Sequence, residues 1–245
     1  MLTLHLKQLF FYRAALLMIT NNTQALINRL KTLETAVIAD VMVAMGLESQ
    51  VLAPSFLSLG LDQILIGPAI CAKGCVEAGD DAKTTFELDD CVYPGGIVVI
   101  DSNNCQKGAL IGDNMATSMK NNGAVGFIVD GGIRDAVEFI TLELPILYKY
   151  KTPINAHKFF SFTHFEVPIS IDGIWGSVTI NPGDLIIADS DGCSIIPLQH
   201  AEQIIADSEV HQQTENNIKL TIKKGETRKN ASAKFPRLQH VDKCA

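Results

Sequence analysis

The chain has 245 residues, of which 47% are hydrophobic and 19% are charged, and its formal net charge at pH 7 is −7. This length suits one large domain or two small ones, and the apolar fraction can supply a substantial core. The negative charge argues against a general affinity for nucleic acid, because binding phosphate groups requires a basic face.

The six cysteines, which lie between Cys71 and Cys244, follow no repeated pairing pattern. Cys71 and Cys75 are four positions apart, but no second pair of Cys or His with zinc-site spacing completes a ligand set. We therefore expect buried, reduced thiols in a cytoplasmic protein.

Residues 1–22 start with an apolar run that Lys7 and Arg13 interrupt. The run is too short and too charged to cross a bilayer, and no small-residue cleavage site follows it. Two interpretations stay open: an amphipathic helix that packs on the body, or a segment upstream of a natural start at Met18. In either case we expect a dispensable N-terminal extension and no membrane partner.

Residues 23–45 predict one helix, because leucines and valines recur along them at helical spacing and a glycine follows. Asp40 lies late in this helix, where a carboxylate usually faces solvent or caps a helix end. Gly67-Pro68 then predicts a bend before a strand over residues 69–76, and Gly79-Asp80-Asp81 predicts a surface turn.

The most informative stretch covers residues 112–135. Asp113 belongs to the residue types preferred at helix N-caps, and residues 114–121 can form about two helical turns before an Asn-Gly stop. Residues 124–129 are apolar and partly β-branched, as expected of a buried parallel strand. Asp130-Gly131-Gly132 predicts the end of that strand.

The lengths of these two elements predict where their ends lie. The helix spans roughly 12–14 Å, and the strand runs roughly 20 Å back in the opposite direction. Asp113, Arg134 and Asp135 should therefore meet at one end of the layer, within reach of a shared ligand. Free N–H groups and the helix dipole there favour a carboxylate or a phosphate. Taken singly, Asp113 could be no more than an N-cap, and Arg134 with Asp135 a surface ion pair.

The elements around this stretch complete a mixed α/β pattern. We expect a helix over residues 84–90, strands over 97–100 and 108–111, a helix over 135–142, a strand over 145–150, a hairpin over 168–180, strands over 185–188 and 195–196, and a helix over 201–222. Residues 151–167 hold four phenylalanines and predict a strand pair or loop that covers the core. His157 and His164 have no carboxylate at ligand spacing, so we do not expect metal ligands there. Residues 226–245 are polar and basic, which predicts a mobile tail.

The motif of an Asp, twenty intervening residues and then Arg-Asp resembles the RraA-like family. That family includes class II (metal-dependent) aldolases of 4-hydroxy-4-methyl-2-oxoglutarate and regulators of ribonuclease activity. Supporting blocks are Ala39-Asp40-Val41, Ile66-Gly67-Pro68-Ala69, and residues 94–101 and 182–192. The resemblance implies one domain over residues 23–225 with a layered β/β/α swivelling-type sandwich, mixed sheets and flanking helices. It also makes Asp40 a marker of the fold.

The resemblance implies a role for each residue of the central motif. An enolate can be stabilised by a lysine Schiff base or by a divalent metal ion, and no lysine stands in a distinctly buried apolar context. Asp135 would instead ligate Mg²⁺ or Mn²⁺, and Arg134 would bind the keto oxygen of a small 2-oxo acid. Asp113 would position a metal-bound water or help to transfer a proton.

Further roles follow from the same resemblance. Gly112, Asn114 and Met115 would hold the substrate carboxylate at the helix N-terminus. Glu215 lies in the helix from which, in the family's aldolases, a neighbouring subunit completes the site. The resemblance thus implies a homotrimer, or a hexamer built from trimers. Gly79-Asp80-Asp81 resembles a Gly-Asp-Asn pocket segment of the family, with Asp81 in place of Asn.

Two functions remain in view. The first is a metal-dependent lyase that cleaves 4-hydroxy-2-oxo acids to pyruvate and also decarboxylates oxaloacetate, because both reactions pass through pyruvate enolate. The second is a regulator that binds a ribonuclease or another protein without turnover. Asp130-Gly131-Gly132 before the Ile-Arg-Asp motif resembles the aldolases, whereas an acidic surface would suit a basic protein partner.

Overall fold

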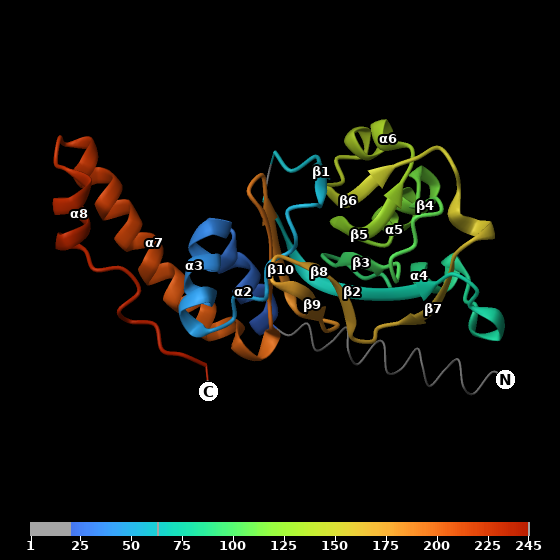
Figure 1. Ribbon diagram of the computed structural model, residues 1–245, viewed down its shortest axis with the longest axis horizontal. Helices are drawn as coiled ribbons and strands as arrows, with labels where there is room; N and C mark the ends of the chain where they lie inside the picture. Colours follow the sequence, from blue (N-terminus) through green and yellow to red (C-terminus); the bar gives the residue numbers. More distant parts are fainter. Residues whose placement is uncertain (1–20, 63, 245) are drawn as a thin grey trace.

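The computed structural model describes residues 21–62 and 64–244 of the chain (Figure 1). The expectations for residues 1–22 therefore lie almost wholly outside the described residues. Within the described part, a curled mixed sheet is flanked by helices, which confirms the predicted mixed α/β fold. No helix there is long and apolar enough to cross a membrane.

Parallel strands form the centre of the sheet, in the order β6-β5-β3-β2. They are β2 (Leu65–Cys75), β3 (Ile97–Asp101), β5 (Gly126–Ile133) and β6 (Ile146–Lys151). Five further strands extend this sheet: β1 (Leu57–Leu59), β4 (Ala109–Ile111), β7 (Ser161–Phe165), β10 (Leu185–Asp189) and β11 (Gly192–Ile196). The predicted hairpin is present as β8 (Ile169–Gly173) and β9 (Gly176–Ile180).

The helices fall into two groups on different parts of the sheet (Figure 1). The first group comprises α4 (Thr85–Asp89), α5 (Asp113–Asn121) and α6 (Ala136–Thr141). The second group comprises α2 (Asn21–Leu30), α3 (Thr35–Met45) and α7 (Ala201–Lys223), followed by α8 (Arg228–Lys234). Short 3-10 turns are η1 (Gly79–Asp81), η2 (Ala156–Lys158) and η3 (Leu198–His200).

Alternation along the strands divides the core between the two faces of the sheet. In β3, Val98 and Ile100 pack toward the first helix group, whereas Ile97 and Val99 pack toward the hairpin. A third apolar cluster joins the second helix group to β10 and β11. The central strands are thus buried on both faces, which explains their nearly continuous apolar sequence.

The single helix predicted over residues 23–45 is wrong, because a turn at residues 31–34 interrupts it between α2 and α3. The Thr32 hydroxyl donates to the Arg29 carbonyl at 2.8 Å, and such a bond competes with helix continuation. Leu33, in the break, is buried in the core of the second helix group. The turn therefore gains apolar burial in exchange for a continuous helix.

The bend predicted at Gly67-Pro68 is also wrong, since both residues lie inside β2. Pro68 is the last β2 residue paired with β10, and Ala69 is the first paired with β3. Proline lacks an N–H, so it fits this change of partner better than a regular ladder position. At Gly67, an added Cβ would lie 2.3 Å from the Gly95 carbonyl oxygen, so close backbone packing, and no turn, requires this glycine.

The third difference concerns Asp130-Gly131-Gly132, which continues β5 instead of ending it. The pairing of β5 with β6 shifts between Val129 and Gly132, as in a β-bulge. An added Cβ on Gly132 would lie 2.5 Å from the Tyr150 ring. The glycines therefore allow the strand to pass beneath neighbouring side chains and to end next to Arg134.

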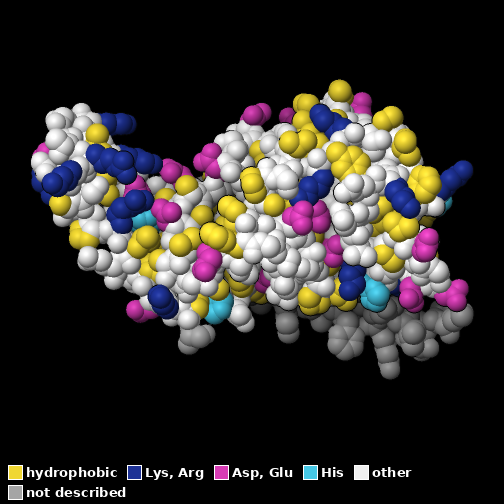
Figure 2. Space-filling view, in the orientation of Figure 1, with side chains coloured by type: hydrophobic (Ala, Val, Ile, Leu, Met, Phe, Trp, Pro, Cys, Tyr) yellow, Lys and Arg dark blue, Asp and Glu magenta, His cyan; other side chains and the backbone are white. Residues whose placement is uncertain are grey.

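Residues 226–244 contain more regular structure than the mobile tail predicted over residues 226–245. The Thr227 side chain accepts a bond from the Asn230 N–H at 3.2 Å and caps α8. The chain then turns back, and the Cys244 N–H donates to the Met45 carbonyl at 2.9 Å. Lys and Arg side chains gather over this C-terminal arm (Figure 2), in agreement with the basic sequence.

Glu166 is a partly buried carboxylate that joins β7 to β2. Its Oε1 accepts a hydrogen bond from the Cys71 N–H at 3.0 Å, and its own N–H donates to the Cys71 carbonyl at 2.7 Å. Burial raises the pKa of Glu166 to about 7, although the bond from Cys71 opposes that rise. The folded state therefore holds a proton here that the unfolded chain releases near pH 4.5.

We predict that Glu166 lowers stability as pH rises from about 4.5 to about 7, because the folded carboxyl must then ionise in a poorly solvated place. Glu166→Gln should remove this slope, so its free energy of unfolding should rise relative to wild type between pH 5 and pH 7.5. Urea unfolding at several pH values measures the difference. Glu143→Gln is the matched control. Glu143 and Glu166 both have a left-handed backbone, with φ 51° and 52°, but Glu143 is exposed. Parallel pH profiles for wild type and Glu166→Gln would contradict the prediction.

Candidate active site

The N-terminus of α5 and the C-terminal end of β5 meet at one edge of the sheet. Gly112 is the N-cap of α5 and Asp113 its first residue, so the prediction of Asp113 as the cap was wrong by one position. The Asp113 N–H donates to Asp135 Oδ2 at 3.2 Å. A carboxylate from the far end of β5 thus satisfies one free N–H of the helix.

Arg134 and Asp135 form a half-buried pair beside this helix end. Arg134 Nε lies 3.3 Å from Asp135 Oδ2, and the side chains are 34% and 35% exposed. The Arg134 N–H donates to the Ile111 carbonyl at 3.2 Å, which fixes the pair to the end of β4. The structure therefore brings Asp113, Arg134 and Asp135 together as their element lengths predict.

Asp135 has a left-handed backbone, with φ 56° and ψ 40°. This conformation is uncommon for a residue with a side chain, although Asp tolerates it better than most. Such strain often collects at functional positions, where surrounding contacts maintain it. Here the contacts come from Arg134 and from the Asp113 N–H.

Gly112 leaves room for the pair. An added Cβ would lie 2.5 Å from Asp135 Oδ2 and 2.8 Å from Arg134 Nε. The φ of Gly112 is −138°, which other residues adopt readily. Glycine is therefore needed at this position for space, because the two charged side chains cross directly over the backbone.

A cavity of about 480 Å³ opens next to Arg134. It is lined by Gly112, Asn114, Met115 and Arg134, whose role in substrate binding stays a prediction. Asp113 and Asp135 are not among its lining residues. Asp135 lines a second hollow of about 360 Å³ together with Arg134, which therefore borders both spaces.

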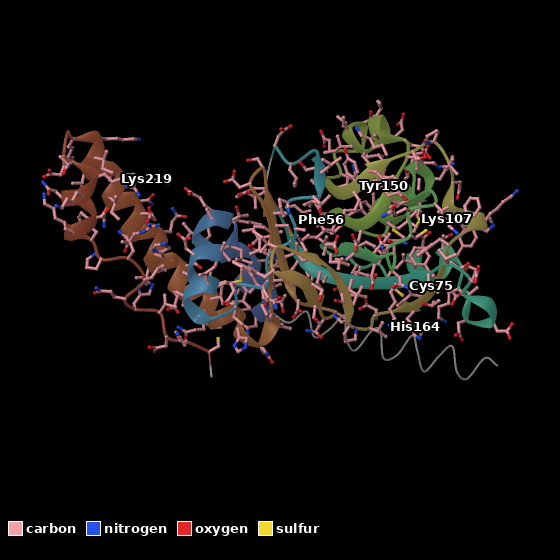
Figure 3. All side chains as sticks on the ribbon, viewed as in Figure 1. Phe56, Cys75, Lys107, Tyr150, His164 and Lys219 are labelled. Atoms are coloured by element: carbon pink, nitrogen blue, oxygen red, sulfur yellow. The ribbon has the colours of Figure 1, made fainter. Side chains whose placement is uncertain are left out.

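The remaining walls of the cavity come from segments that the sequence analysis did not assign to the site. They are Ala82, Lys83, Thr84, Thr85 and Phe86, then Ala109, Leu110 and Ile111, and finally Asn155, Ala156, His157, Phe160, Ser161 and Phe162. Tyr150, labelled in Figure 3, donates to the carbonyls of Cys105 and Gly108 and so holds the loop before β4. The run of phenylalanines was the sequence feature that could have indicated this cavity wall. Phe160 and Phe162 pack into the core and also border the cavity.

The donor set at the pair fits a hard cation that keeps several water ligands. Asp113 and Asp135 offer carboxylate oxygens, the ligand type that Mg²⁺ and Mn²⁺ prefer. Among residues 21–62 and 64–244, no three His, Cys, Asp or Glu side chains are grouped to hold a metal ion. A cation here would therefore depend on one or two carboxylates of this chain, with water and ligand oxygens completing its shell.

Lys149 is the lysine whose burial the sequence analysis did not anticipate. Its side chain is 16% exposed, and its Nζ lies 2.8 Å from Asp172 Oδ2 and 3.8 Å from the centre of the Phe56 ring. Nζ also lies 3.6 Å from Asp130 Oδ1. Burial raises the pKa of Asp130 to about 6, and the Lys149 charge opposes that rise. Lys149 is thus held by acidic partners and does not line the cavity.

Glu215 lies on α7, well away from the Arg134–Asp135 pair. Its Oε1 is 2.5 Å from Arg237 Nε, and Arg237 Nη2 also binds Asp40 Oδ2 at 3.1 Å. Lys219 lies one turn further along α7, and Figure 3 shows it far from Tyr150, which stands on the sheet near the site. Within one chain, Glu215 cannot reach the pair, so its role in a neighbouring subunit's site stays a prediction.

Other residues named from the sequence stand outside the cavity. Asp40 joins the fully buried His211, whose Nε2 lies 3.4 Å away, and so links α3 to α7. Asp80 and Asp81 form the exposed turn η1, as predicted, and do not line the cavity. His164 lies on β7 and is exposed, whereas His157 does border the cavity.

We predict that Gly112→Ala opens the Arg134–Asp135 pair while the fold survives, because the clashing atoms belong to movable side chains. A crystal structure of the variant should place Arg134 Nε well beyond its present 3.3 Å from Asp135 Oδ2. Thr117→Ala, on the exposed side of α5, is the control and should leave the pair unchanged. An intact pair beside the new methyl group would contradict the stated role of Gly112.

Comparison with known proteins identifies the family to which these residues belong. A family model described as "Aldolase/RraA" matches residues 35–195, which includes the whole central motif. A relative from Halalkalibacterium halodurans, named "Putative 4-hydroxy-4-methyl-2-oxoglutarate aldolase", is 36% identical over 137 residues. That match covers 53% of this chain and 63% of the relative, so the chain spans less than two thirds of the relative's length.

Solved structures share the fold over most of their length. An uncharacterized protein from Pseudomonas syringae pv. tomato superimposes with a TM-score of 0.73 at 25% identity, covering 85% of this chain and 96% of that one. Streptomyces coelicolor RraAS2, described as an unusual member of the RNase ES inhibitor RraA protein family, gives 0.69 at 26% identity, covering 78% and 94%. Because the family model covers well over half of the residues, the chain belongs to the RraA-like family.

Proposed function

We propose that the chain is a divalent-metal-dependent lyase that cleaves 4-hydroxy-2-oxo acids to pyruvate, with decarboxylation of oxaloacetate as a second reaction. The observation that carries the proposal is the Arg134–Asp135 pair, held against the N-terminus of α5 at the edge of a cavity. The aldolase name of the relative from H. halodurans supports the same reaction class.

The 2-oxo acid head would bind between α5 and Arg134. Ala116 makes the first intrahelical bond of α5, to the Gly112 carbonyl at 3.0 Å, so the preceding N–H groups point out of the helix end. The Asn114 N–H donates to Asp113 Oδ1 at 2.7 Å. A substrate carboxylate would take over this N–H and that of Met115 when the Asp113 side chain turns away.

Arg134 would supply the charge that the reaction needs. Cleavage breaks the C3–C4 bond, its electron pair moves to the 2-oxo acid as an enolate, and the 4-hydroxyl loses its proton. A guanidinium already fixed by Asp135 can stabilise the enolate oxygen without reorganising. Asp113 would carry the proton from the 4-hydroxyl to C3, which completes pyruvate.

Asp135 would hold Mg²⁺ or Mn²⁺ near the keto and carboxylate oxygens, and Asp113 would stay free of the ion for proton transfer. When bound, the cation would act as a Lewis acid toward the developing enolate charge. The Arg134 contact and the Asp113 N–H keep the Asp135 carboxylate in one orientation for this purpose. A binding role without turnover is the second candidate, supported by the likeness to RraAS2, whose description is that of an inhibitor family.

We predict metal-dependent release of pyruvate from 4-hydroxy-4-methyl-2-oxoglutarate and from oxaloacetate, measured in a coupled assay with Mg²⁺ and with EDTA. Arg134→Ala should lower kcat by about 10²–10³-fold, the usual loss for an oxyanion-stabilising group. Asp135→Ala should abolish the response to metal. Asp191→Ala, in an exposed turn, is the matched control and should keep full activity.

Release that persists in EDTA and in Asp135→Ala would contradict the metal role. No release by folded protein with metal present would favour the regulator. That second function would then be tested by recovering ribonuclease components with the purified chain as bait.

A homotrimer, or a hexamer of trimers, is part of the proposal. Helix α6 follows Asp135 directly, and its Val137 and Ile140 are 71% and 57% exposed, as expected of an interface next to the site. We predict a light-scattering mass of at least three times 26.6 kDa and a smaller mass for Val137→Asp. A wild-type monomer would contradict this prediction.

A further inference from the structure

The cavity beside Arg134 has a charged end and an apolar wall. Its wall is built from Leu110, Ile111, Phe160 and Phe162, which are all buried in the core of the first helix group. The Phe160 and Phe162 rings meet edge to face with their centroids 5.2 Å apart. Rings locked in this way form a fixed surface for another apolar or aromatic group.

The charges around the cavity are distributed unevenly. Arg134, at one end, would hold the 2-oxo acid head. Lys83 borders the cavity as well, but its Nζ lies 3.5 Å from Glu87 Oε2, so a carboxylate of this chain already balances its charge. Glu87 is itself fixed by the Thr84 N–H at 3.1 Å. A second substrate carboxylate would therefore have to compete with Glu87 for Lys83.

Phe86 supplies the third observation. It lies on the short helix α4, lines the cavity and is 76% exposed. An aromatic ring in water beside an apolar wall gains free energy when a ligand covers both. Phe159 is also exposed, at 41%, but borders a different hollow. The chain thus offers a matched pair of surface phenylalanines, one at the cavity and one away from it.

We propose that this cavity prefers 2-oxo acids whose far end, beyond C3, is aromatic or branched aliphatic over those, such as 4-hydroxy-4-methyl-2-oxoglutarate, whose far end carries a second carboxylate. The inference rests on the proposed function for the binding of the 2-oxo acid head. It adds the substrate class: 4-hydroxy-2-oxo acids formed from pyruvate and an apolar aldehyde or ketone. A cavity of about 480 Å³ has room for a phenyl ring as well as the head.

The test measures binding without turnover. 2-Oxo-4-phenylbutanoate and 2-oxoglutarate share the head, differ in the far end, and lack the 4-hydroxyl that cleavage needs. Calorimetry on the full chain with Mg²⁺ should give a dissociation constant at least tenfold lower for the phenyl acid. Phe86→Ala should raise that constant several-fold and leave 2-oxoglutarate unaffected. Phe159→Ala, the control, should change neither constant.

Two results would overturn the inference. The first is equal or tighter binding of 2-oxoglutarate, weakened by Lys83→Ala, which would assign the far end to a carboxylate. The second is no binding of either acid by folded protein. Pyruvate release from the corresponding 4-hydroxy acids is measured separately. Selective binding without any release would refute the lyase and leave the selectivity of the cavity in place.

Discussion

The contact between the Asp135 carboxylate and the N-terminus of α5 is the interaction on which the site depends. One oxygen, Oδ2, accepts the Asp113 N–H and faces Arg134 Nε. It thereby ties the end of β5 to the start of a helix that precedes it by about twenty residues, and it holds a strained backbone in place. Gly112 gives this contact its space. Without the contact from Asp135, the Arg134 side chain would have no fixed orientation, and the cavity would lose its charged end.

The convergence of Asp113, Arg134 and Asp135 could be predicted because it depends on local quantities. A short helix and a returning strand have known rises, and their lengths bring the two ends together. The errors in the same region have a common cause. Gly131 and Gly132 look like strand breakers in isolation, yet neighbouring side chains pack so closely over them that the strand needs them. Sequence spacing does not report such packing.

The cavity walls were beyond prediction for a different reason. Lys83 and Phe162 are far apart in sequence, but the Lys83 N–H donates to the Phe162 carbonyl at 2.7 Å and brings both segments to the cavity. Ala109 is joined in the same way to Ile154. These pairings depend on tertiary contacts that no local pattern encodes. The phenylalanine run did indicate burial, but burial alone does not separate a core residue from a residue that borders a cavity.

Arg134 borders both the large cavity and the smaller hollow that Asp135 lines. Anything that draws its guanidinium toward one space changes the potential in the other, across a single side chain. Occupants of the two spaces are therefore thermodynamically linked, and the linkage is reciprocal: whatever factor one exerts on the affinity of the other must be returned in full. Because both spaces share the Arg134 guanidinium, the chain can couple two binding events without moving a helix or a strand.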